Sequence, residues 1–171
     1  MKKLFISALA IFIIAASARS QNQYEVLKDY ITGGRILKGL ISRDIIARDS
    51  SFSWYKANTK PYTGKDAGTF AKYKDSVQLV IFLGTWCEDS QYLIPKLFPF
   101  LDTAGFSNDR ITMIGVDRDK KSISHLTDAF NIINVPTVIV MKEGKEVGRV
   151  VEYGKYGSLE KEITEIADSA H

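Results

Sequence analysis

The sequence predicts an α/β fold, a central mixed sheet with helices on both faces, preceded by a mostly helical N-terminal extension. Three observations carry this prediction. Apolar runs of strand length alternate with helical patterns after residue 76, whereas the preceding segment combines helical periodicity with turn residues. Hydrophobic residues make up 45% of the 171-residue chain, which suits one globular domain with a core of its own.

Residues 1–20 have the pattern of a secretory signal peptide. Lys2 and Lys3 precede an apolar run over residues 4–16, and small residues follow it. The run is shorter than the ~20 residues that a membrane span needs. We therefore expect a periplasmic or secreted protein that meets the membrane only before cleavage. An uncleaved anchor is the alternative.

The charge balance gives little indication of a partner. The chain has 23 basic and 20 acidic residues, but Lys2, Lys3 and Arg19 all lie in the predicted signal peptide. The mature chain is then close to neutral. We therefore expect no nucleic-acid partner.

Residues 21–75 predict a helical extension packed on the main domain. In residues 35–49, Ile36, Leu37, Leu40 and Ile41 fall on one face of a helix. Four aromatic residues follow between positions 52 and 62, which is too many for a linker. The favoured role is a cap on the domain, and the alternative is that these aromatic side chains line a substrate groove.

Residues 76–171 predict a domain with the order β-α-β-α-β-β-α. Residues 77–84 form a continuous apolar run, which is typical of a strand buried on both faces. A helix begins near Glu88, and a second buried strand covers residues 110–117. Asn131 then suits the left-handed residue that ends the next helix.

The last part of this domain predicts a hairpin and a closing helix. The hairpin covers residues 137–152, and Gly144 supplies the positive φ of its turn. The helix is amphipathic and begins at Ser158, a favourable N-cap. This order of elements predicts a mixed sheet with helices on both of its faces.

The only cysteine, Cys87, stands in the stretch TWCEDS, after a buried strand and before a helix. Pro95 follows eight residues later, and the stretch NVPTVIV contains Pro136. In this order of elements, these motifs resemble the thioredoxin superfamily over residues 75–168. The resemblance implies a thioredoxin-like fold in which a cis-proline at Pro136 faces Cys87. It also implies that Trp86, Val135 and Pro136 bind the substrate.

A cysteine at a helix N-terminus has a physical reason to react. Unpaired backbone N–H groups and the positive end of the helix dipole both favour the thiolate, which is the nucleophile. Glu88 and Asp89 act in two directions, because acids stabilise the first helical turn but disfavour a nearby thiolate.

Two departures from the family pattern occur together. Ser90 stands where a dithiol site has its resolving cysteine, and Ile81 stands where reducing members have a buried aspartate. Ser90 can donate a hydrogen bond to the Cys87 thiolate but cannot release a mixed disulfide. The catalytic pair is therefore predicted to be Cys87 and Ser90, without an internal resolving step.

No other motif predicts chemistry. Cys87, His125 and His171 are too scattered to form a metal-ligand cluster, and the sequence has no glycine-rich phosphate loop. We expect no metal and no cofactor.

The leading hypothesis is an exported thioredoxin-like protein that exchanges disulfides through one thiol. Cys87 would form a mixed disulfide with a protein or a small-molecule thiol partner, and an external thiol would resolve it, as in an isomerase-type oxidoreductase. The alternative is a redox-silent protein-binding module. We expect a monomer, with a Cys87–Cys87 dimer as a third hypothesis.

Overall fold

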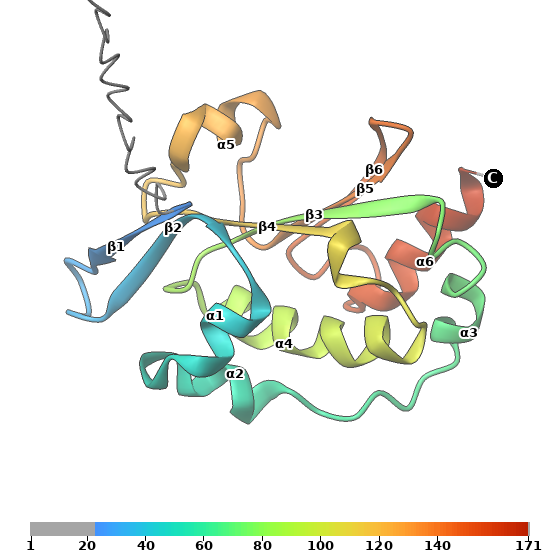
Figure 1. Ribbon diagram of the computed structural model, residues 1–171, viewed down its shortest axis with the longest axis horizontal. Coiled ribbons are helices and arrows are strands. Elements are labelled where there is room, and N and C mark those ends of the chain that lie inside the picture. Colours follow the sequence, from blue (N-terminus) through green and yellow to red (C-terminus); the bar gives the residue numbers. More distant parts are fainter. Residues whose placement is uncertain (1–22, 171) are drawn as a thin grey trace, which may run out of the picture.

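The computed structural model describes residues 23–170, so the predicted signal peptide lies outside the described residues. Within them, the strands form one six-stranded sheet in the order β1-β2-β4-β3-β5-β6 (Figure 1). The strands are β1 (Tyr24–Lys28), β2 (Arg35–Ile41), β3 (Val77–Leu83), β4 (Ile111–Gly115), β5 (Thr137–Lys142) and β6 (Lys145–Val151). The α-helices are α1 (Arg43–Arg48), α2 (Ser53–Asn58), α3 (Asp66–Phe70), α4 (Glu88–Thr103), α5 (Leu126–Ala129) and α6 (Leu159–Ser169).

The sheet is mixed because β3 runs parallel to β4 and antiparallel to β5. At the centre of β3, Ile81 lies opposite Met113 on one neighbour and Val138 on the other. The apolar run of β3 is therefore hydrogen-bonded on both edges as well as covered on both faces, as the sequence predicted.

The two faces of the sheet are covered unequally. Helices α1, α2, α3, α4 and α6 lie on one side of the sheet, which we call the major face, and α5 lies on the other, the minor face (Figure 1). Alternate residues of β3 serve the two sides: Leu79 and Ile81 join the large cluster on the major face, and Phe82 joins the small cluster on the minor face. The predicted fold class, a central mixed sheet with helices on both faces, is confirmed.

The prediction of a helix over residues 35–49 is wrong at its start. Residues 35–41 form β2, which pairs with β1 and with the otherwise free edge of β4. Gly39, with φ of 122°, faces Gly115 across this pairing, and a Cβ on Gly39 would lie 2.6 Å from the Gln23 carbonyl oxygen. Ile36 and Leu37 are both buried, because the two faces of β2 are covered. Pairing with β4 overrides the helical spacing.

The remainder of the extension contains the short helices α1, α2 and α3, with an irregular segment over residues 59–65. Ser42 caps α1 by accepting a hydrogen bond from the Ile45 amide. Phe52 and Tyr55 are buried, and the Tyr55 ring lies 6.3 Å from that of Phe98 on α4. Phe52 and Tyr55 therefore pack into the major-face core, as a cap on the domain would.

Local signals in the second half of the chain place turns and caps correctly. Asn131 and Gly144 both have positive φ, 52° and 76°. The Ser158 hydroxyl accepts a hydrogen bond from the Lys161 amide at the start of α6. Among the helices described, none combines the length and the apolar character that crossing a membrane requires.

Candidate functional site

Cys87 lies at the junction of β3 and α4. It is the N-cap residue of α4: its amide donates to the Gly84 carbonyl (3.0 Å), and its carbonyl accepts from the Gln91 amide (2.9 Å). Hydrogen bonds at both the amide and the carbonyl of Cys87 thus fix the backbone of this junction. The side chain is partly exposed, with its sulfur at the positive end of a 16-residue helix.

The loop before β5 faces the thiol. The Cys87 Sγ donates a hydrogen bond to the Val135 carbonyl oxygen (3.2 Å), and the Val135–Pro136 peptide bond is cis. Both residues are buried, and the loop is held by bonds from Thr137 Oγ1 to the Asn134 carbonyl (2.7 Å) and from the Glu152 amide to the Pro136 carbonyl (2.7 Å). The loop therefore presents its backbone to the thiol.

Trp86 directly precedes Cys87, and both side chains pack against the same small cluster. The Trp86 indole Nε1 donates to the carbonyl of Val116, the residue after β4 (3.0 Å). Gly84 makes room for the ring, since a Cβ at that position would lie 2.8 Å from the indole. The predicted substrate-binding residues Trp86, Val135 and Pro136 are all brought next to Cys87.

Ser90 is fully buried, one turn into α4. Its hydroxyl oxygen accepts a hydrogen bond from the Gly84 amide (3.2 Å), so the bond that the structure gives it runs to the loop before Trp86 and not to the thiol. Ile81 is fully buried on the major face. The two positions that would resolve a mixed disulfide thus carry a structural serine and an apolar core residue.

An ion pair that sequence reasoning missed lies behind Trp86. Arg118 donates two hydrogen bonds to Asp29, Nε to Oδ1 (2.6 Å) and Nη2 to Oδ2 (2.8 Å). The Arg118 guanidinium carbon lies 5.0 Å from the centroid of the Trp86 ring, within the range of a cation–π contact. Asp29 precedes β2 in the chain, so this pair joins the N-terminal hairpin to the thiol site.

Asp29 is held in its charged form. It is 2% exposed, and besides Arg118 it accepts bonds from Thr32 Oγ1 (2.6 Å) and the Ile31 amide (3.1 Å). The hydrogen bonds from Arg118 lower the pKa of Asp29 far below its usual range, against the opposing effect of burial. The only local signal was the spacing of Asp29 and Thr32 before two glycines, which is typical of a turn.

A second missed contact involves Asp89, two residues after the thiol. The Tyr153 hydroxyl donates to Asp89 Oδ1 (3.0 Å), and this bond raises the pKa of Tyr153. Asp89 is thereby drawn toward Tyr153, while its neighbour Glu88 is exposed. One of the two acids after Cys87 is therefore already hydrogen-bonded.

Charged groups of both signs surround the thiol position. Glu88 and Asp89 follow Cys87 in the first turn of α4, and Arg118, paired with Asp29, contacts Trp86. The site can present a single nucleophilic sulfur beside the Trp86 ring and the Val135–Pro136 backbone, and it has no second thiol.

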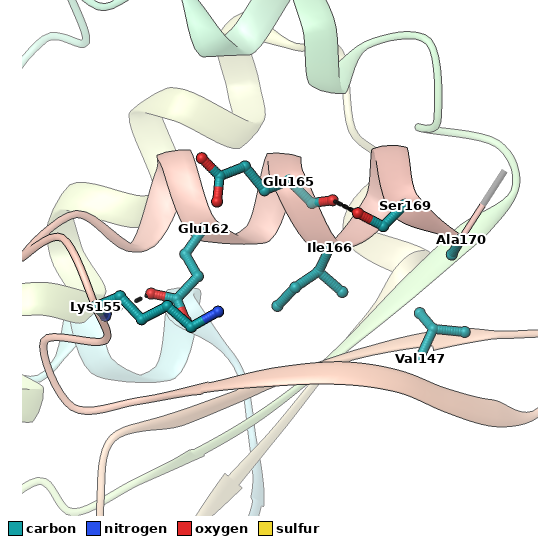
Figure 2. Close-up of a pocket in the computed structure, with 7 residues that line it drawn as sticks. All are labelled: Val147, Lys155, Glu162, Glu165, Ile166, Ser169 and Ala170. Atoms are coloured by element: carbon teal, nitrogen blue, oxygen red, sulfur yellow. Dashed lines mark hydrogen bonds between the residues drawn. The ribbon is translucent and has the colours of Figure 1, made fainter.

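A hollow elsewhere in the molecule is separate from this site. It lies between β6 and α6 and is lined by Val147, Lys155, Glu162, Glu165, Ile166, Ser169 and Ala170 (Figure 2). Glu162 accepts from the Lys155 amide (2.7 Å), and Ser169 donates to the Glu165 carbonyl (2.8 Å). The hollow reaches Ala170, whose carbonyl accepts from Lys142, and Lys142 is paired with the first residue of β3. Cys87 follows the other end of that strand, so the hollow and the thiol lie at opposite ends of β3.

Over residues 23–170, no three His, Cys, Asp or Glu side chains are grouped to hold a metal ion.

Comparison with known proteins assigns the family. A family model described as Thioredoxin matches residues 65–165, more than half of the chain. The chain belongs to the thioredoxin family. The predicted superfamily is thereby confirmed, and the matched residues include Cys87, Ser90 and Pro136 together with all elements from β3 to β6.

Individual relatives match parts of the chain. The TPR repeat-containing thioredoxin TDX of Arabidopsis thaliana is 36% identical over 105 residues, which are 61% of this chain and 26% of that protein. The thioredoxin of Echinococcus granulosus is 29% identical over 86 residues, 50% of this chain and 75% of its own. The chain thus spans about a quarter of the first relative's length.

A solved structure, the germline-specific thioredoxin Deadhead of Drosophila melanogaster, aligns with 57% of this chain and 83% of its own. Its sequence identity is 14% and its TM-score is 0.41. Family membership indicates a thiol–disulfide redox role, and in this chain one cysteine is available for it.

Proposed function

We propose that this protein, exported through its N-terminal signal peptide, exchanges disulfides through the single thiol of Cys87. The observation that carries the proposal is the placement of Cys87 at the N-terminus of α4, within 3.2 Å of the Val135 carbonyl, above a buried serine where a second sulfur would be. The site thus has the nucleophile and the substrate shelf of a thioredoxin but lacks the group that completes a dithiol cycle.

The reaction is a balanced exchange with two external participants. The Cys87 thiolate attacks one sulfur of a partner disulfide. The partner's S–S bond breaks, a new S–S bond forms to Cys87, and the released thiolate takes a proton from water. An external thiol then attacks the mixed disulfide and restores Cys87, so the protein is neither oxidised nor reduced over the cycle.

Ser90 cannot take part in this exchange. Its hydroxyl oxygen already accepts from the Gly84 amide, and an alcohol does not form a disulfide. Ile81, behind the site, offers no carboxylate to accept a proton. The mixed disulfide is therefore expected to persist until an outside thiol arrives, which suits isomerisation, deglutathionylation or the holding of a client.

Ser90→Cys tests the proposal by restoring the second sulfur. We expect wild type to show no turnover of insulin disulfides with a dithiol reductant. Ser90→Cys should form an internal disulfide with Cys87 and gain turnover, because the spacing Cys-x-x-Cys at the start of α4 brings the two sulfurs together. Ser90→Ala is the matched control: it also loses the bond to Gly84, at a cost of about 1 kcal/mol, but gains no sulfur.

The outcome that contradicts the proposal is specific. If Ser90→Cys folds, closes its disulfide and still shows no turnover, the missing sulfur is not what limits this site. The surface around Trp86 and Pro136 would then be shaped for binding, and the binding module would replace thiol exchange as the leading function.

That second function, a redox-silent binding module, is favoured by one contact. The Cys87 thiol donates to the Val135 carbonyl, and only the protonated sulfur makes this bond. Titration of the alkylation rate separates the two functions. Exchange requires the rate to rise through a midpoint below that of a free cysteine, ~8.5, whereas a higher midpoint supports the binding module.

The proposed export has its own test. We expect the protein from its native cell to lack residues up to about position 20, and mass measurement of the intact protein from a periplasmic or secreted fraction checks this. A full-length mass in the membrane fraction would indicate an uncleaved anchor instead.

A further inference from the structure

The tip of the β1–β2 hairpin, residues 29–34, is fastened beside the thiol. Its Asp29 carboxylate is bound by Arg118, and Arg118 lies over Trp86. Trp86 directly precedes Cys87 in the chain. The tip is thus tied to the thiol site through Arg118 and Trp86, although it is far from this site in the sequence.

The tip is also internally fixed. The Asp29 amide donates to the Gly34 carbonyl (2.8 Å), and the Gly33 amide donates to the Asp29 carbonyl (2.8 Å). The Asp29 side chain closes the turn through Ile31 and Thr32. A turn with this many hydrogen bonds holds its outward-facing side chains in place.

Those outward-facing side chains are large and apolar. Tyr30 is 75% exposed and Ile31 is 64% exposed. An ordered turn that carries two such side chains next to a reactive group is typical of an interaction surface.

Two other segments that reach the thiol site also carry exposed apolar side chains. Ile133 is 77% exposed and stands two residues before Val135, whose carbonyl contacts the thiol. Tyr153, 41% exposed, is hydrogen-bonded to Asp89, two residues after Cys87. Three segments that are distant in the chain thus carry exposed apolar side chains and are each linked to a residue next to Cys87 or in contact with it.

The charges around the sulfur indicate what this surface accommodates. Glu88 is exposed next to Cys87, and Asp89 adds a second carboxylate. The nearby cation, Arg118, is already paired with Asp29. An anionic small disulfide such as glutathione disulfide would be repelled by Glu88 and Asp89, and Arg118 is not free to pair with it. An apolar segment of polypeptide would instead contact the exposed apolar side chains.

We propose that Tyr30 and Ile31, at the hairpin tip, form a binding surface for the apolar side chains that flank a disulfide-bonded cysteine in a partner polypeptide. The inference rests on the proposed thiol exchange and names its substrate class. The Cys87 thiolate attacks the partner's disulfide, the new bond joins Cys87 to the partner's cysteine, and the other sulfur leaves as a thiolate. The tip changes neither of these steps and acts by holding the partner.

The experiment compares two peptides and one small reagent on the whole mature chain. Each peptide carries one cysteine as a mixed disulfide with a chromophoric thiol, with phenylalanine and leucine flanks in one peptide and glycine and serine flanks in the other. The neutral reagent dipyridyl disulfide reports the reactivity of Cys87 alone. Release of the chromophore gives the rate in each case.

The variant is Tyr30→Ser with Ile31→Ser, two exposed positions whose side chains support no part of the core. The matched control is Val147→Ser on β6, a partly exposed apolar position in the hollow away from the thiol. We expect wild type to react about tenfold faster with the apolar peptide than with the polar one. The tip variant should lose most of this preference, while Val147→Ser keeps it and all three proteins react equally with dipyridyl disulfide.

Several outcomes overturn the proposal. Equal rates with the two peptides in wild type would show that no apolar surface is used. An equal slowing of the tip variant with dipyridyl disulfide would show that the tip acts on the thiol and not on the partner.

Failure of the thiol chemistry is distinguishable from failure of the surface. If wild type does not react even with dipyridyl disulfide, the proposed exchange is wrong, and the tip is then tested by binding of the apolar peptide with serine in place of its cysteine. Weaker binding to the tip variant than to wild type upholds the surface, and equal binding removes it.

Discussion

The two faces of the sheet differ in what they contribute. The major face holds the large cluster, in which Phe70, Phe100 and Phe106 pack with ring centroids 5.2 and 5.3 Å apart. Of the α-helices in residues 23–170, α5 alone covers the minor face, and the small cluster there includes Trp86 and Cys87 as partly buried members. The thiol thus lies where cover is thinnest, so stability depends mainly on one face and access to the sulfur on the other.

The largest expected effect comes from deleting an aromatic ring on the major face. Phe100 is fully buried against Phe70 and Tyr62, so Phe100→Ala should lower the free energy of unfolding by about 3–5 kcal/mol. Phe130→Ala, the matched change on the minor face, removes a partly exposed ring that contacts Phe82 and should cost less than half as much. Urea denaturation measures the free energy of unfolding of both variants. Equal losses would show that the two faces contribute equally to stability.

The next effect places a charge in the major-face core. Ile81→Asp puts a carboxylate at a fully buried position between β4 and β5, and an uncompensated buried polar group costs about 1–3 kcal/mol or more. In the Ser90→Cys background it should nevertheless raise reductase turnover, because a buried carboxylate can accept the second thiol's proton. Ile81→Asn is the control, which carries a similar burial cost without a base. Equal turnover of the Asp and Asn variants would show that no base is needed there.

A pH-dependent effect is expected where the hairpin meets the minor-face site. The folded pKa of Asp29 is depressed by its bonds to Arg118, so its contribution to stability is complete above the unfolded value of ~3.9 and is lost as pH falls toward the folded pKa. Asp29→Asn should therefore lower the melting temperature most at neutral pH, and the difference from wild type should shrink below about pH 4. A difference that is constant with pH would contradict the assignment of charge to Asp29.

The smallest effect concerns the exposed rim of the site. Tyr153→Phe removes only the hydroxyl that donates to Asp89, so the free energy of unfolding should change by less than about 0.5 kcal/mol. The freed carboxylate should slow alkylation of Cys87 slightly, because a nearby negative charge disfavours the thiolate. Alkylation rates measured at two salt concentrations check this, since salt should reduce an electrostatic difference.

The sequence predicted the elements from β3 to α6 because their signals are local. Buried strands show as continuous apolar runs, and Asn131, Gly144 and Ser158 mark ends and turns by their own conformational preferences. The β1–β2 hairpin was missed because the spacing of Ile36, Leu37 and Ile41 fits both a helix and a strand covered on two faces. Only the free edge of β4, a long-range feature, decides between these structures.

The candidate site also divides into residues with local signals and residues whose contacts are long-range. Trp86, Cys87, Val135 and Pro136 stand in two short motifs, so the resemblance to the thioredoxin superfamily predicted that they lie together. Asp29 and Arg118 are 89 residues apart, and nothing local to either indicates the other. The tip that they fasten was predicted to be part of a helical extension, so its position beside the thiol depends on knowing the strand order.

The most direct test of single-thiol exchange is the mass of the intact protein after incubation with a disulfide-bonded polypeptide and without free thiol. Exchange through Cys87 predicts one adduct per chain, absent in Cys87→Ser, stable until an external thiol is added and short-lived in Ser90→Cys. An accessible, alkylatable Cys87 that forms no adduct would contradict the account.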